Sequence, residues 1–435
     1  MAFEDSLADL PHMVTTTRDP ASATSPYFDN HGVIETNITD RAFSVTATLT
    51  VQSAVQMADG VFDPGHELLS ELYKPLGRCI AVVDEDVDRV HGPHIRGYFA
   101  AHGIDLNLLV CRARERDKNL GTVSRIVDFL GTNGCDVSRR EPVLVIGGGV
   151  LSDTAGLACA LLHRRTPYVM VGTSIVSAID AGPSPRTCVN ADGFKNFLGA
   201  YHPPVLTVVD RTLLATLDAR YLRHGVAEMV KMAVVDDAEL FRLLEHAGPN
   251  LVSTGFSPPA DSEPDVGGQI LYRSLYAYMK HEGTNMFEAY QDRPHAYGHT
   301  WSPTFEPRAR LLHGHAVAIE MCFSAAIALQ LGWISKDDRA RIVRLCTSLG
   351  LAANHPVIHD IDLLLQAQES MRAKRGGRAL WAPLPRKAIG SCDYLSEAPA
   401  SLLKSAVAEH ATFCRQLPDN GAGTQVGLPD EPSDT

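Results

Sequence analysis

Two histidines at the start of a long apolar segment have side chains that could bind a metal ion. His299 and His313 lie in the stretch 293–321, and the sequence around Glu228 favours a helix that sets Glu228 and Lys231 one turn apart on the same face. Two imidazoles and one carboxylate suit zinc and leave a coordination position open for a substrate. The spacing alone is not a general metal motif, because most histidines are ordinary core or surface residues. A nucleotide-type glycine loop and a group of Lys and Arg residues in the same chain favour the metal hypothesis.

The composition is typical of a soluble globular protein. The chain has 435 residues, 45% apolar and 21% charged, which is enough for two domains with their own cores. A net charge of −12 argues against nucleic acid or an anionic membrane as a partner, so clustered Lys and Arg residues suggest an anionic ligand. Nine cysteines without a CxxC pair are typical of reduced thiols. No segment resembles a signal peptide or a membrane span, so a cytoplasmic location is expected.

Strand-like and helix-like patterns alternate through the first half, which predicts a parallel sheet covered by helices. The expected strands are 42–51, 79–84, 104–111 and 142–149. After about residue 210, helical periodicity dominates. The sequence therefore predicts an irregular N-terminal extension (1–40), an NAD-binding α/β domain (41–209), a mostly α-helical metal and substrate domain (210–415) and a flexible tail (416–435).

A glycine turn follows the buried strand at 143–146. Glycines 147–149 would let the backbone approach a ligand closely, and the helix that begins near Asp153 would present free N–H groups to a pyrophosphate. The pattern differs from the GxGxxG fingerprint, so a simple tight turn is the alternative.

Three more residues in the first half could contact a nucleotide. Asp84 ends the strand at 79–83, where a carboxylate can meet ribose hydroxyls at the carboxyl edge of a parallel sheet. Its alternative role is the N-cap of the next helix. Glu115 and Lys118 could also reach the nucleotide, or form a solvated surface pair.

Six motifs then occur in a characteristic order: GGGVLSDTAG, a TS…DAG segment, KNFLGAYHPP, HGVAEMVK, YGHTWSPTFE and LLHGHAVAIEM. This set resembles the sugar phosphate cyclases, the superfamily of dehydroquinate synthase, over about 80–400. Within that superfamily, PSPRT at 183–187, GAYHPP and GHTWSP are similar to the 2-epi-5-epi-valiolone synthases of cyclitol natural-product pathways. The resemblance implies NAD, zinc or cobalt, a homodimer, and a nucleotide domain joined to a helical domain.

The resemblance also implies a role for each matching residue. The metal ligands would be Glu228, His299 and His313. The nucleotide would contact Asp84, Glu115, Lys118, Gly148, Gly149, Asp153, Thr173 and Ser174. The catalytic residues would be Lys231, Asp180, Lys195 and Asn196, and the substrate would be bound by Arg164, Arg186, Lys280, Arg293 and His315. Asp180 lies in the apolar sequence IVSAIDAG, where an unpaired carboxylate would be costly, whereas Lys280 could equally be a surface residue.

Three departures disfavour dehydroquinate synthesis. Arg186 replaces a Lys, Pro303 replaces a second His, and His315 stands where dehydroquinate synthases have Glu. The expected reaction is cyclisation of sedoheptulose 7-phosphate to 2-epi-5-epi-valiolone with loss of phosphate. The alternatives are synthesis of 2-epi-valiolone, demethyl-4-deoxygadusol or 3-dehydroquinate, an NAD- and metal-dependent alcohol dehydrogenase, and a non-catalytic binding protein.

Overall fold

A six-stranded parallel sheet forms the core of the N-terminal half in this computed structural model, which describes residues 13–15, 27–37, 42–257 and 264–427. The strand order is β4-β11-β8-β7-β5-β6. The strands are β4 (Ala54–Met57), β5 (Arg78–Asp84), β6 (Asp105–Cys111), β7 (Val143–Gly147), β8 (Tyr168–Gly172) and β11 (Leu206–Val209). The surrounding helices are α1 (Leu68–Tyr73), α2 (Glu85–Ala101), α3 (Leu120–Thr132), α4 (Gly149–Leu161), α5 (Ile175–Ile179) and α6 (Arg211–Leu214). The predicted helix-covered parallel sheet is confirmed.

Burial on both faces explains why the central strands are continuously apolar. Ala81 and Val83 of β5 pack in one cluster with Tyr98 and Phe99 of α2. The alternate residues of β5 pack in a second cluster with α3 and α4. Because the strands are parallel, their carboxyl ends meet at one edge, where the glycine turn and the predicted nucleotide residues lie.

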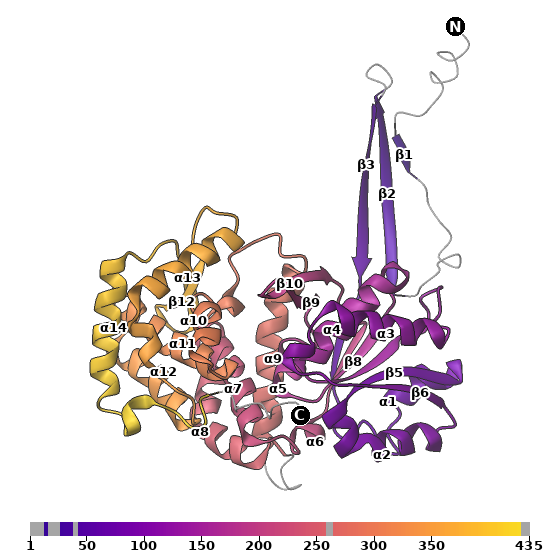
Figure 1. Ribbon diagram of the computed structural model, residues 1–435, viewed down its shortest axis with the longest axis horizontal. Helices are drawn as coiled ribbons and strands as arrows, with labels where there is room; N and C mark the ends of the chain where they lie inside the picture. The colour runs from indigo at the N-terminus through magenta and orange to yellow at the C-terminus, as the bar shows by residue number, and fades with distance from the viewer. Residues whose placement is uncertain (1–12, 16–26, 38–41, 258–263, 428–435) are drawn as a thin grey trace.

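Helices dominate after β11, as the sequence predicts (Figure 1). They are α7 (Ala219–Val235), α8 (Ala238–Thr254), α9 (Val266–Thr284), α10 (Ser302–Ala309), α11 (His313–Gln330), α12 (Lys336–Ser348), α13 (Ile361–Lys374) and α14 (Ala400–Cys414). Two hairpins complete the described elements, β9 (Arg186–Ala191) with β10 (Phe194–Tyr201) and β12 (Ala382–Arg386) with β13 (Ala388–Leu395). The short 3-10 helices are η2 (Lys74–Leu76), η3 (Glu115–Asp117), η4 (Leu162–Arg164), η5 (Pro294–Ala296), η6 (Pro356–His359) and η7 (Pro418–Gly421). Strand β11 ends at Val209 and helices follow it, so we propose 209/210 as the boundary between the two domains.

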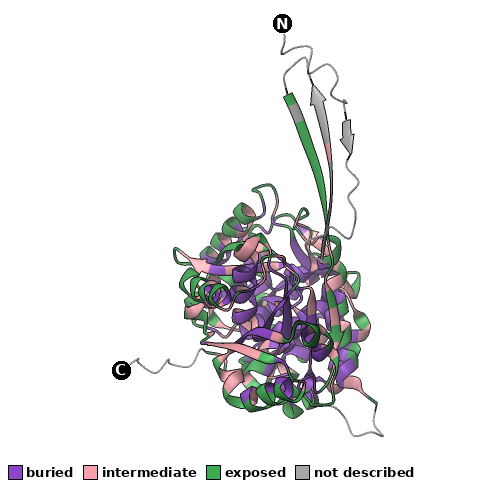
Figure 2. Cartoon of the chain, turned by 90° about the vertical axis from the view of Figure 1, so that its right-hand side faces the viewer, coloured by how far each residue is buried: buried purple, intermediate pink, exposed green. Residues whose placement is uncertain are grey.

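A long antiparallel ribbon projects from the sheet half (Figures 1 and 2). It consists of β1 (Met13–Thr15), β2 (Phe28–Asn37) and β3 (Ala42–Val51). The strand expected at 42–51 is confirmed, but the prediction of an irregular extension was wrong for 13–15 and 28–37. The sequence of β2 does not alternate, and the strand is defined by backbone pairing with β3, from Phe28 opposite Val51 to Asn37 opposite Ala42. Residues 1–12, 16–26 and 38–41 of the expected extension lie outside the described residues.

The C-terminal segment also differs from the expectation. Residues 418–421 form η7, and the backbone of 424–427 bonds to Gly350 and to 311–312. The prediction of a flexible tail was therefore wrong for 418–427, and 428–435 lie outside the described residues. Across the part of the chain that the structure describes, every helix is too short or too polar to span a membrane.

Two buried histidines should make stability depend on pH. Burial lowers the pKa of His202 and of His410 to about 4, and their Nε2 atoms lie 2.7 Å from Thr166 O and 2.8 Å from Ala353 O. Both are neutral in the folded state and gain protons on unfolding at a pH between about 4 and 6.5. Stability is therefore complete above about pH 6.5 and falls as the pH decreases, by up to about 3 kcal/mol per histidine.

Urea unfolding at several pH values between 4.5 and 7.5 measures this dependence. His202→Gln should flatten the slope of unfolding free energy against pH, while His246→Gln, at an exposed position, should leave it unchanged. Equal slopes in the wild type and His202→Gln would show that His202 does not contribute.

Candidate functional site

Three residues from separate elements meet at one point between the helices. Glu228 lies on α7, His299 precedes α10, and His313 is the first residue of α11. One ligand atom from each lies within 4.8 Å of the other two. The Nε2 atoms of His299 and His313 lie 3.7 and 3.3 Å from Glu228 Oε1. The predicted convergence is confirmed, and the role of these residues as metal ligands stays a prediction.

The hydrogen bonds of the two imidazoles leave their Nε2 atoms available to a metal. His299 Nδ1 lies 3.1 Å from Tyr297 O, and His313 Nδ1 lies 2.7 Å from Glu306 Oε2. Each Nδ1 faces an acceptor, and in a neutral imidazole that carries its proton on Nδ1 the Nε2 atom is available to a metal beside Glu228. Glu228 Oε1 is buried and accepts no hydrogen bond from the described residues. A divalent cation at this point would satisfy all three side chains.

Glycines and a buried glutamate fix the backbone that carries the histidines. Gly314 lets α11 approach α7 closely, because a Cβ there would lie 2.6 Å from the Cα of His224. Glu320 of α11 accepts hydrogen bonds from the N–H groups of Thr300 and Trp301, each at 2.7 Å. Glu320 therefore holds the loop that follows His299. The sequence analysis missed this role, because the contact joins Glu320 to a residue 20 positions earlier in the chain.

Lys231 and Asp180 adjoin the triad. Lys231 Nζ is buried between Glu228 Oε2, at 2.5 Å, and Asp180 Oδ2, at 3.2 Å. Burial lowers the pKa of Lys231, but the Asp180 and Glu228 carboxylates raise it more, so the net direction is upward. Lys231 therefore stays a cation, and Asp180 has the partner that its apolar sequence context requires.

Glu306 joins Lys195 to the triad. Lys195 Nζ lies 3.0 Å from Glu306 Oε1, while Glu306 Oε2 accepts the His313 hydrogen bond. Burial raises the pKa of Glu306, but His313 and Lys195 outweigh it and hold the pKa at about 2. Glu306 stands at the end of the YGHTWSPTFE motif, yet the sequence analysis did not single it out.

We expect Glu306→Gln to weaken zinc binding by about 10- to 100-fold, because the amide no longer fixes the His313 ring as a carboxylate does. Competition with a chromophoric chelator measures the dissociation constant. Glu397→Gln, at an exposed position, is the matched control and should bind zinc as the wild type does. Wild-type affinity in Glu306→Gln would contradict the positioning role.

Asn196 contacts residues that were predicted to bind the nucleotide. Its Oδ1 accepts a hydrogen bond from Lys118 Nζ at 2.6 Å, and Lys118 forms an ion pair with Asp153. Glu115 Oε1 accepts from Asn190 at 2.9 Å and lies 3.8 Å from Lys195 Nζ. The alternative of a solvated Glu115–Lys118 pair is wrong for Lys118, which is buried. The β9–β10 hairpin thus connects the residues that were predicted to be catalytic with those that were predicted to contact the nucleotide.

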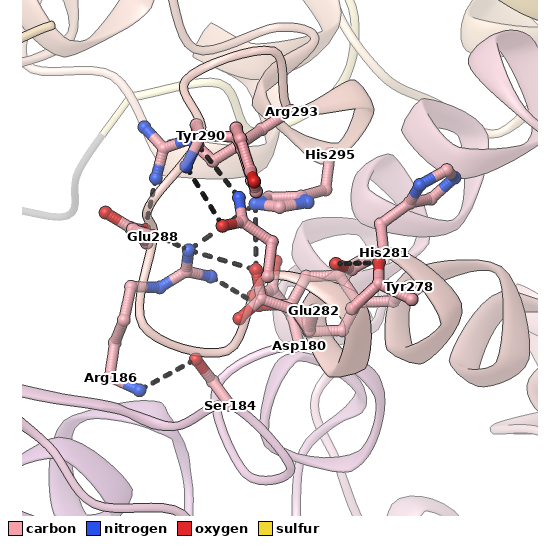
Figure 3. Close-up of polar contacts among 12 residues, drawn as sticks. Asp180, Ser184, Arg186, Tyr278, His281, Glu282, Glu288, Tyr290, Arg293 and His295 are labelled. Carbon is pink, nitrogen blue, oxygen red and sulfur yellow. Dashed lines mark hydrogen bonds and ion pairs between the residues drawn. The ribbon is translucent and has the colours of Figure 1, made fainter. Parts of the chain in front are cut away.

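Arg186 and Arg293, which were predicted to bind substrate, are held by carboxylates (Figure 3). Arg186 Nη1 lies 3.2 Å from Glu282 Oε1 and 2.7 Å from Glu288 Oε1. Its guanidinium also donates to the hydroxyl of Tyr278, and Arg293 forms an ion pair with Glu288. Phosphate binding by either arginine would require these ion pairs to exchange partners, so that role stays a prediction.

Two of the three remaining predicted substrate residues, Lys280 and Arg164, have no described contact with the triad. Lys280 forms an ion pair with Asp236 at 2.7 Å, and Arg164 lies exposed in η4. Among the described contacts, none links either residue to the metal ligands. His315 is buried, and its Nδ1 accepts the N–H of Ala352 at 3.0 Å. In this structure His315 holds a loop, which is a different environment from the substrate contact that we expected.

The three glycines of the turn differ in how much room they leave for a side chain. A Cβ on Gly148 would meet Ser174 Oγ at 3.6 Å, whereas a Cβ on Gly147 would lie 2.8 Å from Leu151. Gly147 is therefore required by packing, whereas a Cβ on Gly148 would make only an ordinary van der Waals contact beside the start of α4. Thr173 and Ser174 follow β8 at the same edge, where the Thr173 N–H donates to Gly147 O at 3.1 Å.

Asp84 lies at this edge as the N-cap of α2, with its side chain accepting the Asp86 N–H at 2.8 Å. The alternative capping role is thus confirmed, and ribose binding stays a prediction. Helix α5 then leads from the edge to the triad. Its N-cap is Ser174, its C-cap is Asp180, and Ile175 packs so closely on α7 that a Cβ on Gly225 would lie 2.2 Å away.

Comparisons with known proteins agree with these motifs. The family model of the 3-dehydroquinate synthase N-terminal domain matches residues 108–224, and that of the C-terminal domain matches 225–372. A demethyl-4-deoxygadusol synthase from Trichormus variabilis is 37% identical over 89% of this chain and 94% of its own length. A 2-epi-5-epi-valiolone synthase from an Actinoplanes species is 40% identical over 76% of this chain and 82% of its own.

One solved structure of a protein with a related sequence has the same fold as this chain. It is the 2-epi-5-epi-valiolone synthase of Streptomyces hygroscopicus subsp. jinggangensis 5008 with NAD+ and Zn2+ bound. It is 35% identical, with a TM-score of 0.78, and the match covers 84% of this chain and 98% of the other.

Proposed function

Because the chain belongs to the 3-dehydroquinate synthase family of sugar phosphate cyclases, we propose that it cyclises sedoheptulose 7-phosphate with loss of phosphate. The product we favour is 2-epi-5-epi-valiolone. One observation carries the proposal: Glu228, His299 and His313 converge beside the ion pair that buried Lys231 forms with Asp180. Helix α5 runs from Ser174, which lies beside Gly148, to Asp180, so it links the predicted nucleotide edge to that pair.

We further propose NAD and a divalent metal, zinc or cobalt, as cofactors. Gly148, Gly149, Thr173 and Ser174 would hold the NAD at the carboxyl edge of the sheet, and Glu228, His299 and His313 would hold the metal. When bound, NAD+ supplies reversible hydride transfer, and the metal supplies Lewis-acid polarisation of hydroxyl and carbonyl groups. A hydride taken from the substrate would be given back to it later in the same turnover, so no net NADH would be formed.

The protein's own side chains position the substrate and stabilise its charge. Lys231 remains protonated between two carboxylates, so its ammonium can stabilise an anionic oxygen next to the triad. Lys195 offers a second cation on the opposite side of Glu306. Together they would hold a flexible seven-carbon chain in the geometry that ring closure needs.

The electrostatics around Arg186 support a substrate without a carboxylate. A dehydroquinate synthase acts on a sugar acid, whose carboxylate requires a free cation. Here Glu282 and Glu288 neutralise Arg186, and Pro303 has no group that can transfer a proton. Sedoheptulose 7-phosphate carries a neutral hydroxymethyl ketone at that end, which suits a neutralised site better.

Incubation with sedoheptulose 7-phosphate, NAD+ and Zn2+, followed by NMR of the product, tests this function. A spectrum that matches authentic 2-epi-5-epi-valiolone supports the favoured reading. A cyclised product with a different spectrum keeps the cyclase and changes the product, and an unchanged substrate overturns both.

Demethyl-4-deoxygadusol is the second candidate product. It is supported by the relative from Trichormus variabilis, which matches a larger share of this chain than the Actinoplanes relative does. The same NMR experiment separates the two products. The homodimer is likewise a proposal, and light scattering of the purified protein would test it.

A further inference from the structure

We propose that the C-terminal strap, defined here as residues 421–427, positions the metal ligand His313. The strap passes across the segment that begins α11 and closes against two neighbouring segments. This inference rests on the proposed metal site, because it concerns how that site is held in place. It assigns a function to a segment whose sequence predicted only a flexible tail.

The first contact lies directly before His313. Leu312 is the N-cap of α11, and its N–H donates to Val426 O at 2.9 Å. Leu311 forms an isolated antiparallel bridge with Gly427. Leu312 has no side-chain cap hydrogen bond, and the entry of the chain into α11 is fixed by this backbone pairing together with the Leu311 N–H bond to Glu306 O at 3.1 Å. The strap therefore sets the position from which the His313 side chain starts.

The second contact lies against the loop that holds His315. Gly423 has φ +75°, and a Cβ there would lie 2.5 Å from Ala352 N and 2.7 Å from Ala352 Cα. Gly421 O accepts the Ala353 N–H at 2.8 Å. Because Ala352 N–H bonds to His315 Nδ1, the strap supports the first turn of α11 through this loop as well.

The third contact reaches α7, the helix that carries Glu228. Arg223 donates from Nη2 to Gln425 Oε1 at 2.6 Å. The next residue is His224, whose ring centroid lies 5.1 Å from that of His313. The strap thus touches the chain before His313, the loop beside it and the helix opposite it. Loss of these contacts should loosen one ligand of the three.

Zinc affinity of truncated chains tests the strap directly. Deletion of 418–435 removes the strap, and deletion of 428–435 is the matched control because it keeps all of residues 421–427. Competition with a chromophoric chelator gives the zinc dissociation constant, and the visible spectrum of the cobalt-substituted protein reports ligand geometry. We expect the control to equal the full chain, and the longer deletion to weaken zinc binding by about 10- to 100-fold with an altered cobalt spectrum.

Point variants keep the test decisive where the long deletion does not fold. Gln425→Ala removes the bond to Arg223 and should weaken zinc binding in the same direction, whereas Gln416→Ala, at an exposed position before the strap, should have no effect. Gly423→Val should act more strongly, because its side chain cannot fit against Ala352. Unchanged affinity and an unchanged cobalt spectrum in both strap variants would overturn the positioning role.

The proposed metal site can fail separately from the strap. If the full chain binds no zinc, the ligand assignment is wrong, and the strap inference falls with it. If the full chain binds one zinc and the strap variants bind it equally well, the metal site stands and only the strap inference is overturned. A lower melting temperature with unchanged metal binding would show a purely structural role.

Discussion

His299→Ala should lose the bound metal and the cyclase activity together. The Nε2 atom of His299 is one of three ligand atoms within 4.8 Å of one another, and its Nδ1 bond to Tyr297 O fixes the ring in that orientation. With two ligands left, the site offers too few donors for stable zinc coordination. A lost Lewis acid costs several kcal/mol of transition-state stabilisation, so activity should fall by about a thousandfold or more.

Elemental analysis of the purified variant, with circular dichroism as a check of folding, measures this result. His246→Ala is the matched control, because it removes an exposed imidazole distant in sequence from the triad. One zinc per chain in a folded His299→Ala protein would show that the ligand set is wrong. Retained metal with lost activity would instead assign His299 to substrate.

Gly148→Val should weaken NAD binding and leave the fold intact. Gly148 has an extended backbone conformation with φ −83°, which valine also adopts. A Cβ at this position would lie 3.6 Å from Ser174 Oγ, which is an ordinary contact distance. The backbone can therefore accept a side chain, which would then project into the space that we assign to the cofactor. Overpacking of this kind costs about 1–3 kcal/mol, which corresponds to about 10- to 100-fold weaker binding.

Calorimetric titration with NAD+ measures the effect, and Gly148→Ala should give an intermediate affinity. Gly147→Val provides the contrasting case, because a Cβ there lies 2.8 Å from Leu151 and should lower the melting temperature itself. Unchanged NAD affinity in a folded Gly148→Val protein would rule out the glycine turn as the cofactor site.

Local patterns made the sheet and the triad predictable. The strand at 79–84 is apolar because both faces are buried, and the helix around Glu228 shows its periodicity directly. The motifs placed His299 and His313 at the same site. The order of the strands and the distance between the ligand atoms required the structure, because both depend on contacts between distant parts of the chain.

The residues that escaped the sequence analysis act through long-range contacts. Glu306 is 111 positions from Lys195, and Glu282 is 96 positions from Arg186, so no local pattern reveals these pairs. The same reason explains β2, whose pairing with β3 determines its conformation. In the strap, a Gly-rich polar sequence typical of a mobile end is ordered by its backbone hydrogen bonds.

Phosphate release from two sugar phosphates tests the central claim most directly. The enzyme with NAD+ and Zn2+ is offered sedoheptulose 7-phosphate or 3-deoxy-arabino-heptulosonate 7-phosphate, while orthophosphate and NADH absorbance are followed together. The account predicts orthophosphate from sedoheptulose 7-phosphate alone, without accumulation of NADH. Release from 3-deoxy-arabino-heptulosonate 7-phosphate alone would contradict it, and NADH accumulation without phosphate release would identify a dehydrogenase instead.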